Sequence, residues 1–124
     1  MQAKQRAEAM SSPSPEWDCK ARIALIRVND AEGAETISLM FKIYGFEVVI
    51  ERFDERTQGI RPAIIFVDVA ADLHLDDRLR KFQTVWVGTK IELMANRVAA
   101  AEHAHRLTLP VDIVELEKII VALF

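Results

Sequence analysis

Polar residues that can bind cations or accept groups follow two apolar runs of this sequence. Asn29 and Asp30 come directly after the run 23–28, and Asp68 comes directly after the run 63–67. Carboxylate and amide oxygens are the ligands that a hard cation such as magnesium takes in proteins. A carboxylate beside that cation could accept a phosphoryl group, because the metal offsets the charge that develops on the transferred oxygens. These three residues are the first candidates for a functional site.

The elements that would position these residues are short apolar, β-branched runs that alternate with helical patterns. This alternation is typical of a parallel sheet with helices on both faces. Because the carboxyl ends of the strands face the ligand crevice in such sheets, polar residues at those ends are expected to converge. The expected strands are 23–28, 47–51, 63–67, 84–87 and 105–109.

Helical periodicity predicts three longer helices. The first carries an apolar stripe of Ala34, Ile37, Phe41 and Tyr44 and ends at Gly45, after which Phe46 can pack back on the last turn. A second covers 91–104, with Leu93, Val98 and Ala101 as core contacts, and Asp112 caps a third with Ile113, Leu116, Ile119, Ile120 and Leu123 on its stripe. The stretches after the second and third strands allow only a helix of a turn or two, the latter over 78–82.

Composition limits the classes of protein that fit. The 124 residues are 51% hydrophobic, which is enough for one core, and 16 Lys and Arg against 19 Asp and Glu give a net charge of -3. Nucleic acid is therefore not expected as a partner, because phosphate binding needs clustered positive charge. The single Cys19 forms no internal disulfide, and no apolar run approaches the ~20 residues that span a bilayer. We expect a cytoplasmic protein that does not enter a membrane.

Residues 1–20 are rich in Ser, Pro and charge and predict a flexible N-terminal tail or linker, which leaves 21–124 as the folded domain. Catalytic motifs are sparse. Cys19 lies in the tail, Ser38 lies inside an expected helix without a nearby base, and the segment after the first strand contains only one glycine, Gly33. We therefore do not expect an enzyme, although a small enzyme or ligand-binding domain stays as an alternative.

Over about residues 22–124, the chain resembles the receiver domains of two-component response regulators. The resemblance rests on RVND, IIFVD, WVGT and LTLP, each of which closes an expected strand. It implies a flavodoxin-like (βα)5 three-layer sandwich, with a five-stranded parallel sheet in the order 2-1-3-4-5. The second and third helices are shortened relative to the family.

The resemblance also implies roles for the residues at the first and third strand ends. Asp68 matches the phosphoacceptor aspartate, and Asn29 and Asp30 match the acidic pair that binds magnesium. Ala70 matches the residue whose carbonyl completes the metal site. Asn29 removes one negative charge from that site, for which Glu32 could compensate, so we expect no cofactor or only weakly bound magnesium.

The resemblance also implies roles for residues that follow the fourth expected strand or lie in the fifth. Thr89 matches the hydroxyl residue that responds to phosphorylation, with Gly88 as the alternative register, and Arg106 stands at the position of the aromatic switch residue. Leu109 stands where the family has a lysine, followed by the matching Pro110. Receivers carry a cis bond before this proline, so the bond between Leu109 and Pro110 is predicted to be cis.

The departures at these positions favour a degenerate receiver, or pseudo-receiver. Leu109 has no ammonium group to pair with the aspartate or the phosphoryl oxygens, and Arg106 provides no ring to move. We expect a regulatory protein-interaction module of bacterial-type two-component signalling that acts without phosphorylation. The alternative is a working receiver that a histidine kinase phosphorylates on Asp68.

The last helix is the expected contact surface. The sequence ends in six apolar residues, 119–124, and one helical stripe cannot bury all of them against a single sheet. We expect this helix to bind a protein partner, whether a histidine kinase, an output domain or a second copy of the chain, with a homodimer as the specific prediction.

Overall fold

The computed structural model describes residues 22–52, 59–70 and 78–124. The tail predicted over 1–20 and most of the short helix expected after the second strand lie outside the described residues. The elements are β1 (Ile23–Arg27), α1 (Ala31–Ile43), β2 (Glu47–Ile50), β3 (Ile64–Asp68), α2 (Arg78–Lys81), β4 (Thr84–Gly88), α3 (Lys90–Ala95), β5 (His105–Thr108) and α4 (Ile113–Leu123). The bounds of all strands agree with the predicted ones to within one residue.

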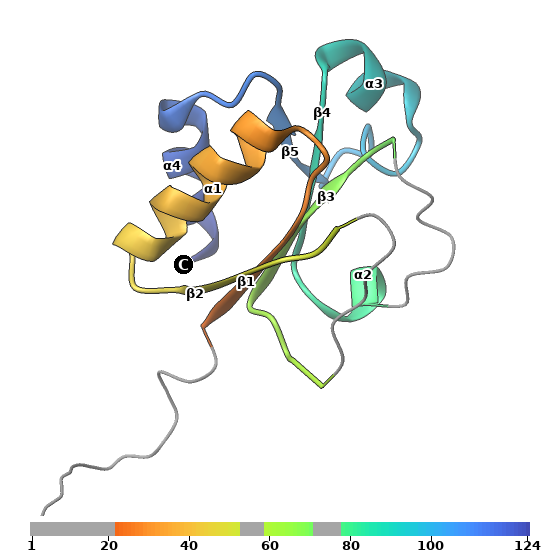
Figure 1. The fold of residues 1–124 in the computed structure, drawn as a ribbon. Coiled ribbons are helices and arrows are strands. Elements are labelled where there is room, and N and C mark those ends of the chain that lie inside the picture. The colour runs from red at the N-terminus through yellow and green to blue at the C-terminus, as the bar shows by residue number, and fades with distance from the viewer. Residues whose placement is uncertain (1–21, 53–58, 71–77) are drawn as a thin grey trace, which may run out of the picture.

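The strands form a five-stranded sheet in the order β2-β1-β3-β4-β5, and each adjacent pair is parallel. Helices α1 and α4 cover one face of the sheet, and α2 and α3 lie on the other (Figure 1). This arrangement confirms the predicted flavodoxin-like sandwich. The carboxyl ends of β1, β3 and β4 lie at the same edge of the sheet, as parallel pairing requires.

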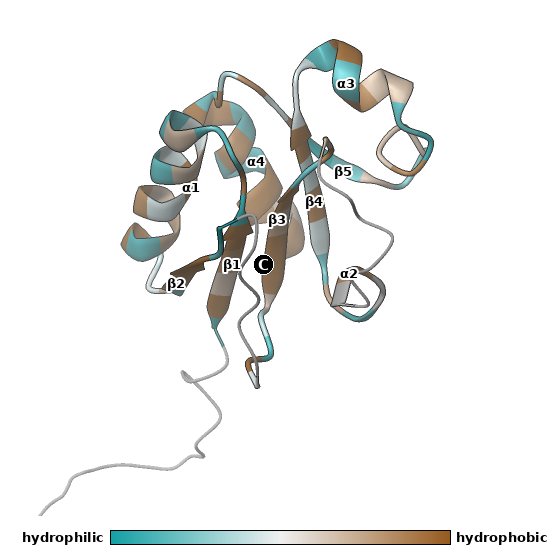
Figure 2. Cartoon of the chain, turned by 45° about the vertical axis from the view of Figure 1, so that its right-hand side comes forward, coloured by the Kyte–Doolittle hydropathy of each residue, from teal (hydrophilic) through white to brown (hydrophobic). Residues whose placement is uncertain are grey.

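Strand β3 is buried along its whole length, because it is central and helices cover both of its faces. Its side chains alternate between two cores. Ile64 and Phe66 belong to the α1/α4 core, and Ile65 and Val67 belong to the smaller α2/α3 core. The apolar strands accordingly run through the middle of the molecule (Figure 2).

Helix α1 packs on the sheet through Ala34, Ile37 and Phe41, as its periodicity predicts. Gly45 adopts a φ of +88°, a left-handed conformation that glycine reaches without steric cost, and it ends the helix. Phe46 then packs edge-on against Phe41, with 4.8 Å between the ring centroids. The expectation for Tyr44 is wrong, because this residue is the C-cap and its side chain is 42% exposed.

Helix α3 ends at Ala95, so the prediction of a helix to residue 104 is wrong. The cause is Asn96, whose backbone is extended and whose Oδ1 accepts hydrogen bonds from the backbone N–H groups of Val98 and Ala99, both at 3.0 Å. Asparagine side chains compete with helical hydrogen bonding in this way. The predicted core contacts Val98 and Ala101 are exposed, and Ala99 is buried in their place.

Helix α4 begins where predicted, since the Asp112 side chain accepts a hydrogen bond from the backbone N–H of Val114. Leu116, Ile119 and Ile120 are buried, whereas Ile113 is exposed, because it lies in the first turn. None of the helices in the described ranges is long and apolar enough to cross a bilayer.

The beginning of β1 and the end of the chain meet at one aromatic cluster. The ring of Phe124 lies 5.1 Å from that of Phe46, centroid to centroid. The guanidinium carbon of Arg22 lies 5.4 Å from the Phe46 centroid and 6.0 Å from the Phe124 centroid, within the range of cation–π attraction.

Candidate functional site

Asp68 ends β3 with its carboxylate largely buried, the residue being only 8% exposed. Its Oδ1 accepts a hydrogen bond from the backbone N–H of Ala70 at 3.0 Å, and its Oδ2 accepts one from the backbone N–H of Asn29 at 3.4 Å. These main-chain donors hold the carboxylate between the ends of β1 and β3. Three of the predicted site residues therefore meet at this point.

Asp30 is the N-cap of α1. Its Oδ2 accepts a hydrogen bond of 2.8 Å from the backbone N–H of Gly33, which satisfies one of the free donors of the first turn. A Cβ on Gly33 would lie 2.9 Å from that same oxygen, so a larger residue at this position would displace the capping carboxylate. The carboxylate of Asp30 thus already has a structural role.

The predicted metal ligands provide few carboxylates. Glu32, which could compensate for Asn29, is exposed on the first turn of α1. Within the described ranges, no group of three or more His, Cys, Asp or Glu side chains comes together to hold a metal ion. Carboxylates from Asp30 and Asp68 with oxygens from Asn29 and Ala70 make a weakly charged donor set, and magnesium binding there stays a prediction.

Leu109 lies beside the first turn of α1. Its half-buried side chain packs against the α1/α4 core, and its Cδ2 lies 3.1 Å from the point where a Cβ of Gly33 would stand. Its backbone N–H donates to the carbonyl of Gly88 at 2.8 Å, and the bond to Pro110 is cis, as predicted. An apolar side chain therefore fills the position at which the resemblance places a lysine.

Thr89 is the N-cap of α3 and forms a capping box with Glu92. Its Oγ1 accepts a hydrogen bond from the backbone N–H of Glu92 at 3.2 Å, while its own N–H donates to Oε1 of Glu92 at 2.9 Å. Residues 89–92 contain the Thr-x-x-Glu pattern of a capping box before a helix, although this cap was not predicted from the sequence. The hydroxyl of Thr89 is thus engaged at the start of α3.

Arg106 extends from β5 to the segment between α3 and β5. Its Nη1 donates hydrogen bonds to the carbonyls of Ala99 at 2.9 Å and Ala101 at 3.0 Å. The sequence alone gives no sign of these contacts, because in the helix predicted over 91–104 the carbonyl of Ala99 would accept from the backbone N–H of residue 103.

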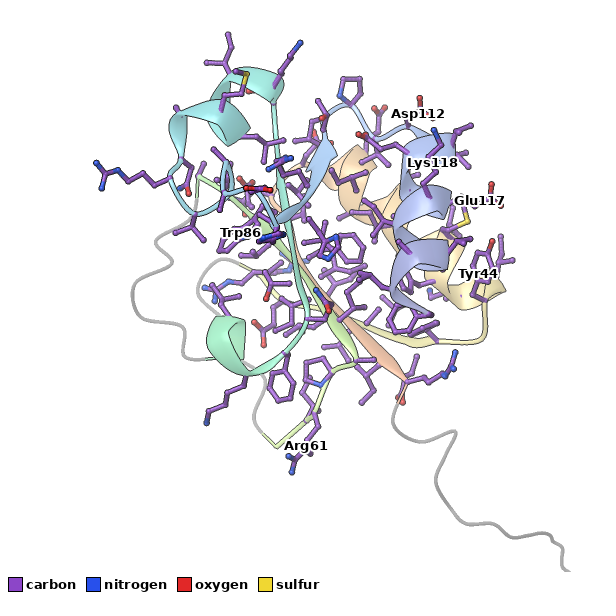
Figure 3. The ribbon with its side chains drawn as sticks, turned by 180° about the vertical axis from the view of Figure 1, so that it is seen from behind. Tyr44, Arg61, Trp86, Asp112, Glu117 and Lys118 are labelled. Atoms are coloured by element: carbon purple, nitrogen blue, oxygen red, sulfur yellow. The ribbon has the colours of Figure 1, made fainter. Side chains whose placement is uncertain are left out.

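Helices α1 and α4 are joined by a hydrogen bond from the Tyr44 hydroxyl to Oε2 of Glu117, at 3.2 Å (Figure 3). Partial loss of hydration raises the pKa of Tyr44, and the charge of Glu117 and its hydrogen bond to the phenol raise it further. The two residues are 73 positions apart, so no local pattern predicts this pair.

A cavity of about 710 Å³ opens beside Asn29, between α1 and the ends of β1 and β2. Its walls include Val28, Ser38 and Leu39, but not Asp68. At Asp30 and Pro110 the surface is hollowed by only about 60 Å³. The Asp68 carboxylate is therefore not part of either cavity.

Comparisons with known proteins find similarity in structure rather than in sequence. No family model matches the chain, and no curated protein matches it in sequence. The solved structure of the chemotaxis response regulator CheY4 of Vibrio cholerae is similar, with a TM-score of 0.60 and 16% sequence identity over 83% of this chain and 98% of that chain. The chain has the CheY-like, flavodoxin-like receiver fold.

Proposed function

We propose that this chain is a degenerate receiver-like domain, a regulatory protein-interaction module that acts without phosphorylation of Asp68. The observation that carries the proposal is the apolar, half-buried side chain of Leu109. This side chain lies against the first turn of α1 and the α1/α4 core, in the place where a receiver would present an ammonium group.

The electrostatics of the site support this proposal. A phosphoryl group on Asp68 would add about -1.5 to -2 charges at pH 7 beside the negative Asp30. Neither Leu109 nor Asn29 carries a charge, so magnesium would have to offset the added charge from a site with few carboxylates. The phosphorylated state would be correspondingly unfavourable.

The surface proposed for protein binding is the α3–β5–α4 face, formed by α3, the segment 96–104, β5 and α4. Large apolar side chains are exposed on its helices, namely Ile91 and Met94 on α3 and Ile113, Val114 and Val121 on α4. Val121 is 71% exposed, and the terminal Phe124 is 50% exposed. Exposed apolar groups of this kind favour association, and we propose a second copy of the chain as the partner.

The test is intact-mass measurement after incubation with acetyl phosphate and magnesium. We expect no appreciable gain of one phosphoryl group, and Asp68→Asn should leave self-association, measured by sedimentation, unchanged. Stoichiometric labelling that Asp68→Asn abolishes would overturn the proposal and establish the working receiver instead.

A further inference from the structure

The segment between α3 and β5 is held from both of its ends. At its beginning, Oδ1 of Asn96 accepts the backbone N–H groups of Val98 and Ala99. From β5, Nη1 of Arg106 donates to the carbonyls of Ala99 and Ala101. Ala99 therefore has its N–H and its carbonyl fixed by two different side chains.

Packing supplies a third point of attachment. The side chain of Ala99 is completely buried in the α2/α3 core, in the cluster that contains Trp86 and Leu93, while Ala104 packs against the edge of that cluster. Residues on either side of Ala99 are exposed, so this methyl group is the part of the turn that enters the core. The backbone around Ala99 is thus held by hydrogen bonds, and the buried methyl group of Ala99 attaches it to the core.

The Arg106 bonds are charge-assisted, and such bonds are shorter and stronger than neutral ones. They start from β5, which pairs with β4 along its length, so their donor is attached to the sheet itself. Arg106 also lines a cavity of about 580 Å³ in the α3–β5–α4 face, together with Met94, His105 and Glu115. The same side chain therefore fixes the turn and shapes the neighbouring surface.

We infer that Arg106 is a positioning residue that holds the segment 96–104 in one conformation whatever the state of Asp68. This inference rests on the proposed function and adds its regulation: the α3–β5–α4 face is permanently formed, rather than formed in response to a signal at Asp68. The hydrogen bonds of Arg106, those of Asn96 and the burial of Ala99 involve no atom of Asp68, so they do not depend on its state. We call the two hydrogen bonds of Arg106 the clamp.

Amide hydrogen exchange of the full chain tests the clamp. In Arg106→Met we expect the protected amides of residues 97–104 to exchange about tenfold faster or more, the change expected when a hydrogen bond to a charged group is lost. Amides of β1 and β3 should keep their rates, and Arg106→Lys should give an intermediate effect. Arg97→Met is the matched control, because Arg97 is an exposed arginine on the same segment with no hydrogen bond to another described residue. Unchanged exchange in both Arg106 variants would overturn the inference.

A second arm separates this inference from the proposed function. Wild-type protein is compared with and without acetyl phosphate and magnesium, and exchange over 97–104 should be the same in both samples. A change of exchange in this segment that Asp68→Asn abolishes would overturn the inference. Phosphoryl labelling by mass without any change of exchange would instead overturn the proposed function and leave the clamp standing.

Discussion

At the scale of single residues, the proposal that Asp68 does not accept phosphate rests on two uncharged side chains. Asn29 lies at the end of β1 and Leu109 beside α1, and each stands where a charged group would help to neutralise or bind the reacting species. Replacing both residues therefore tests whether charge alone determines the activity of Asp68.

We predict that Asn29→Asp raises magnesium affinity about tenfold or more, because it returns a negative charge close to the cation. The double variant Asn29→Asp, Leu109→Lys should in addition acquire measurable labelling by acetyl phosphate. Calorimetric titration with magnesium and intact-mass measurement check the two effects. Labelling that stays at the wild-type level in the double variant would show that geometry, rather than charge, limits the reaction.

The residues that form this site could largely be predicted from the sequence, but the contacts that their side chains make could not. The ends of β1 and β3 follow from apolar runs that stop at Asn29 and Asp68, and parallel pairing brings those ends together. The position of Leu109 beside Gly33 depends on how α1 packs next to the loop after β5, for which the sequence holds no local signal.

At the scale of elements, side-chain caps determine where the helices begin. Asp30, Thr89 and Asp112 each accept a hydrogen bond from a backbone N–H of the first turn. Asp30 serves both this cap and the predicted metal site, so its two roles need to be separated.

We predict that Asp30→Ala lowers the free energy of unfolding by about 1 kcal/mol, the usual cost of losing an N-cap. Asp30→Asn keeps an oxygen that can accept from Gly33, so it should stay within a few tenths of a kcal/mol of the wild type. Urea denaturation of the two variants measures both values. Equal losses in the two would mean that the charge of Asp30, and not its cap, stabilises α1.

Element lengths were predicted well except at α3. The alanine-rich stretch 91–104 has high helix propensity, but the Asn96 side chain accepts hydrogen bonds from the backbone, and Arg106 donates to the Ala99 carbonyl that the predicted helix would use. Propensity is a weak preference that such tertiary contacts override. The predicted α4, by contrast, agrees because its cap and buried stripe point to the same bounds.

The contact between α1 and α4 gives a prediction on pH. Tyr44 is the only tyrosine of the chain, so tyrosinate absorbance reports on it alone. Its pKa should lie above the ordinary value of about 10, and Glu117→Gln should move the pKa back towards that value by removing a charge and weakening a hydrogen bond. The phenol of Tyr44 loses its proton at lower pH in the unfolded chain than in the folded one. The stability that the pair contributes is therefore complete below pH about 10 and decreases as the pH rises through the folded pKa. An identical titration in Glu117→Gln would contradict the pairing.

At the scale of the whole molecule, the exposed apolar side chains of α4 predict association. The wild type should show concentration-dependent dimerisation in sedimentation experiments, and Val121→Lys should weaken it by placing a charge in the apolar contact. Leu39→Lys is the control, because Leu39 is similarly exposed but lines the cavity next to β2, at the opposite edge of the sheet from β5. A wild type that stays monomeric at high concentration, or equal effects of the two variants, would exclude α4 as the contact.

Arg22 and the rings of Phe46 and Phe124 place the start of β1 beside the last described residue, so the strands could be connected in a different order along the chain. Because β1 starts beside the residue that ends the chain, residues 1–21 could link Phe124 back to Arg22, and a new pair of ends could be opened at the exposed Gly59. This circular permutant would carry its strands in the order β3, β4, β5, β1, β2 along the chain and still form the same sheet. A far-ultraviolet circular dichroism spectrum like that of the parent, with a cooperative thermal transition, would show that the fold depends on which surfaces meet rather than on the order in which the strands are connected.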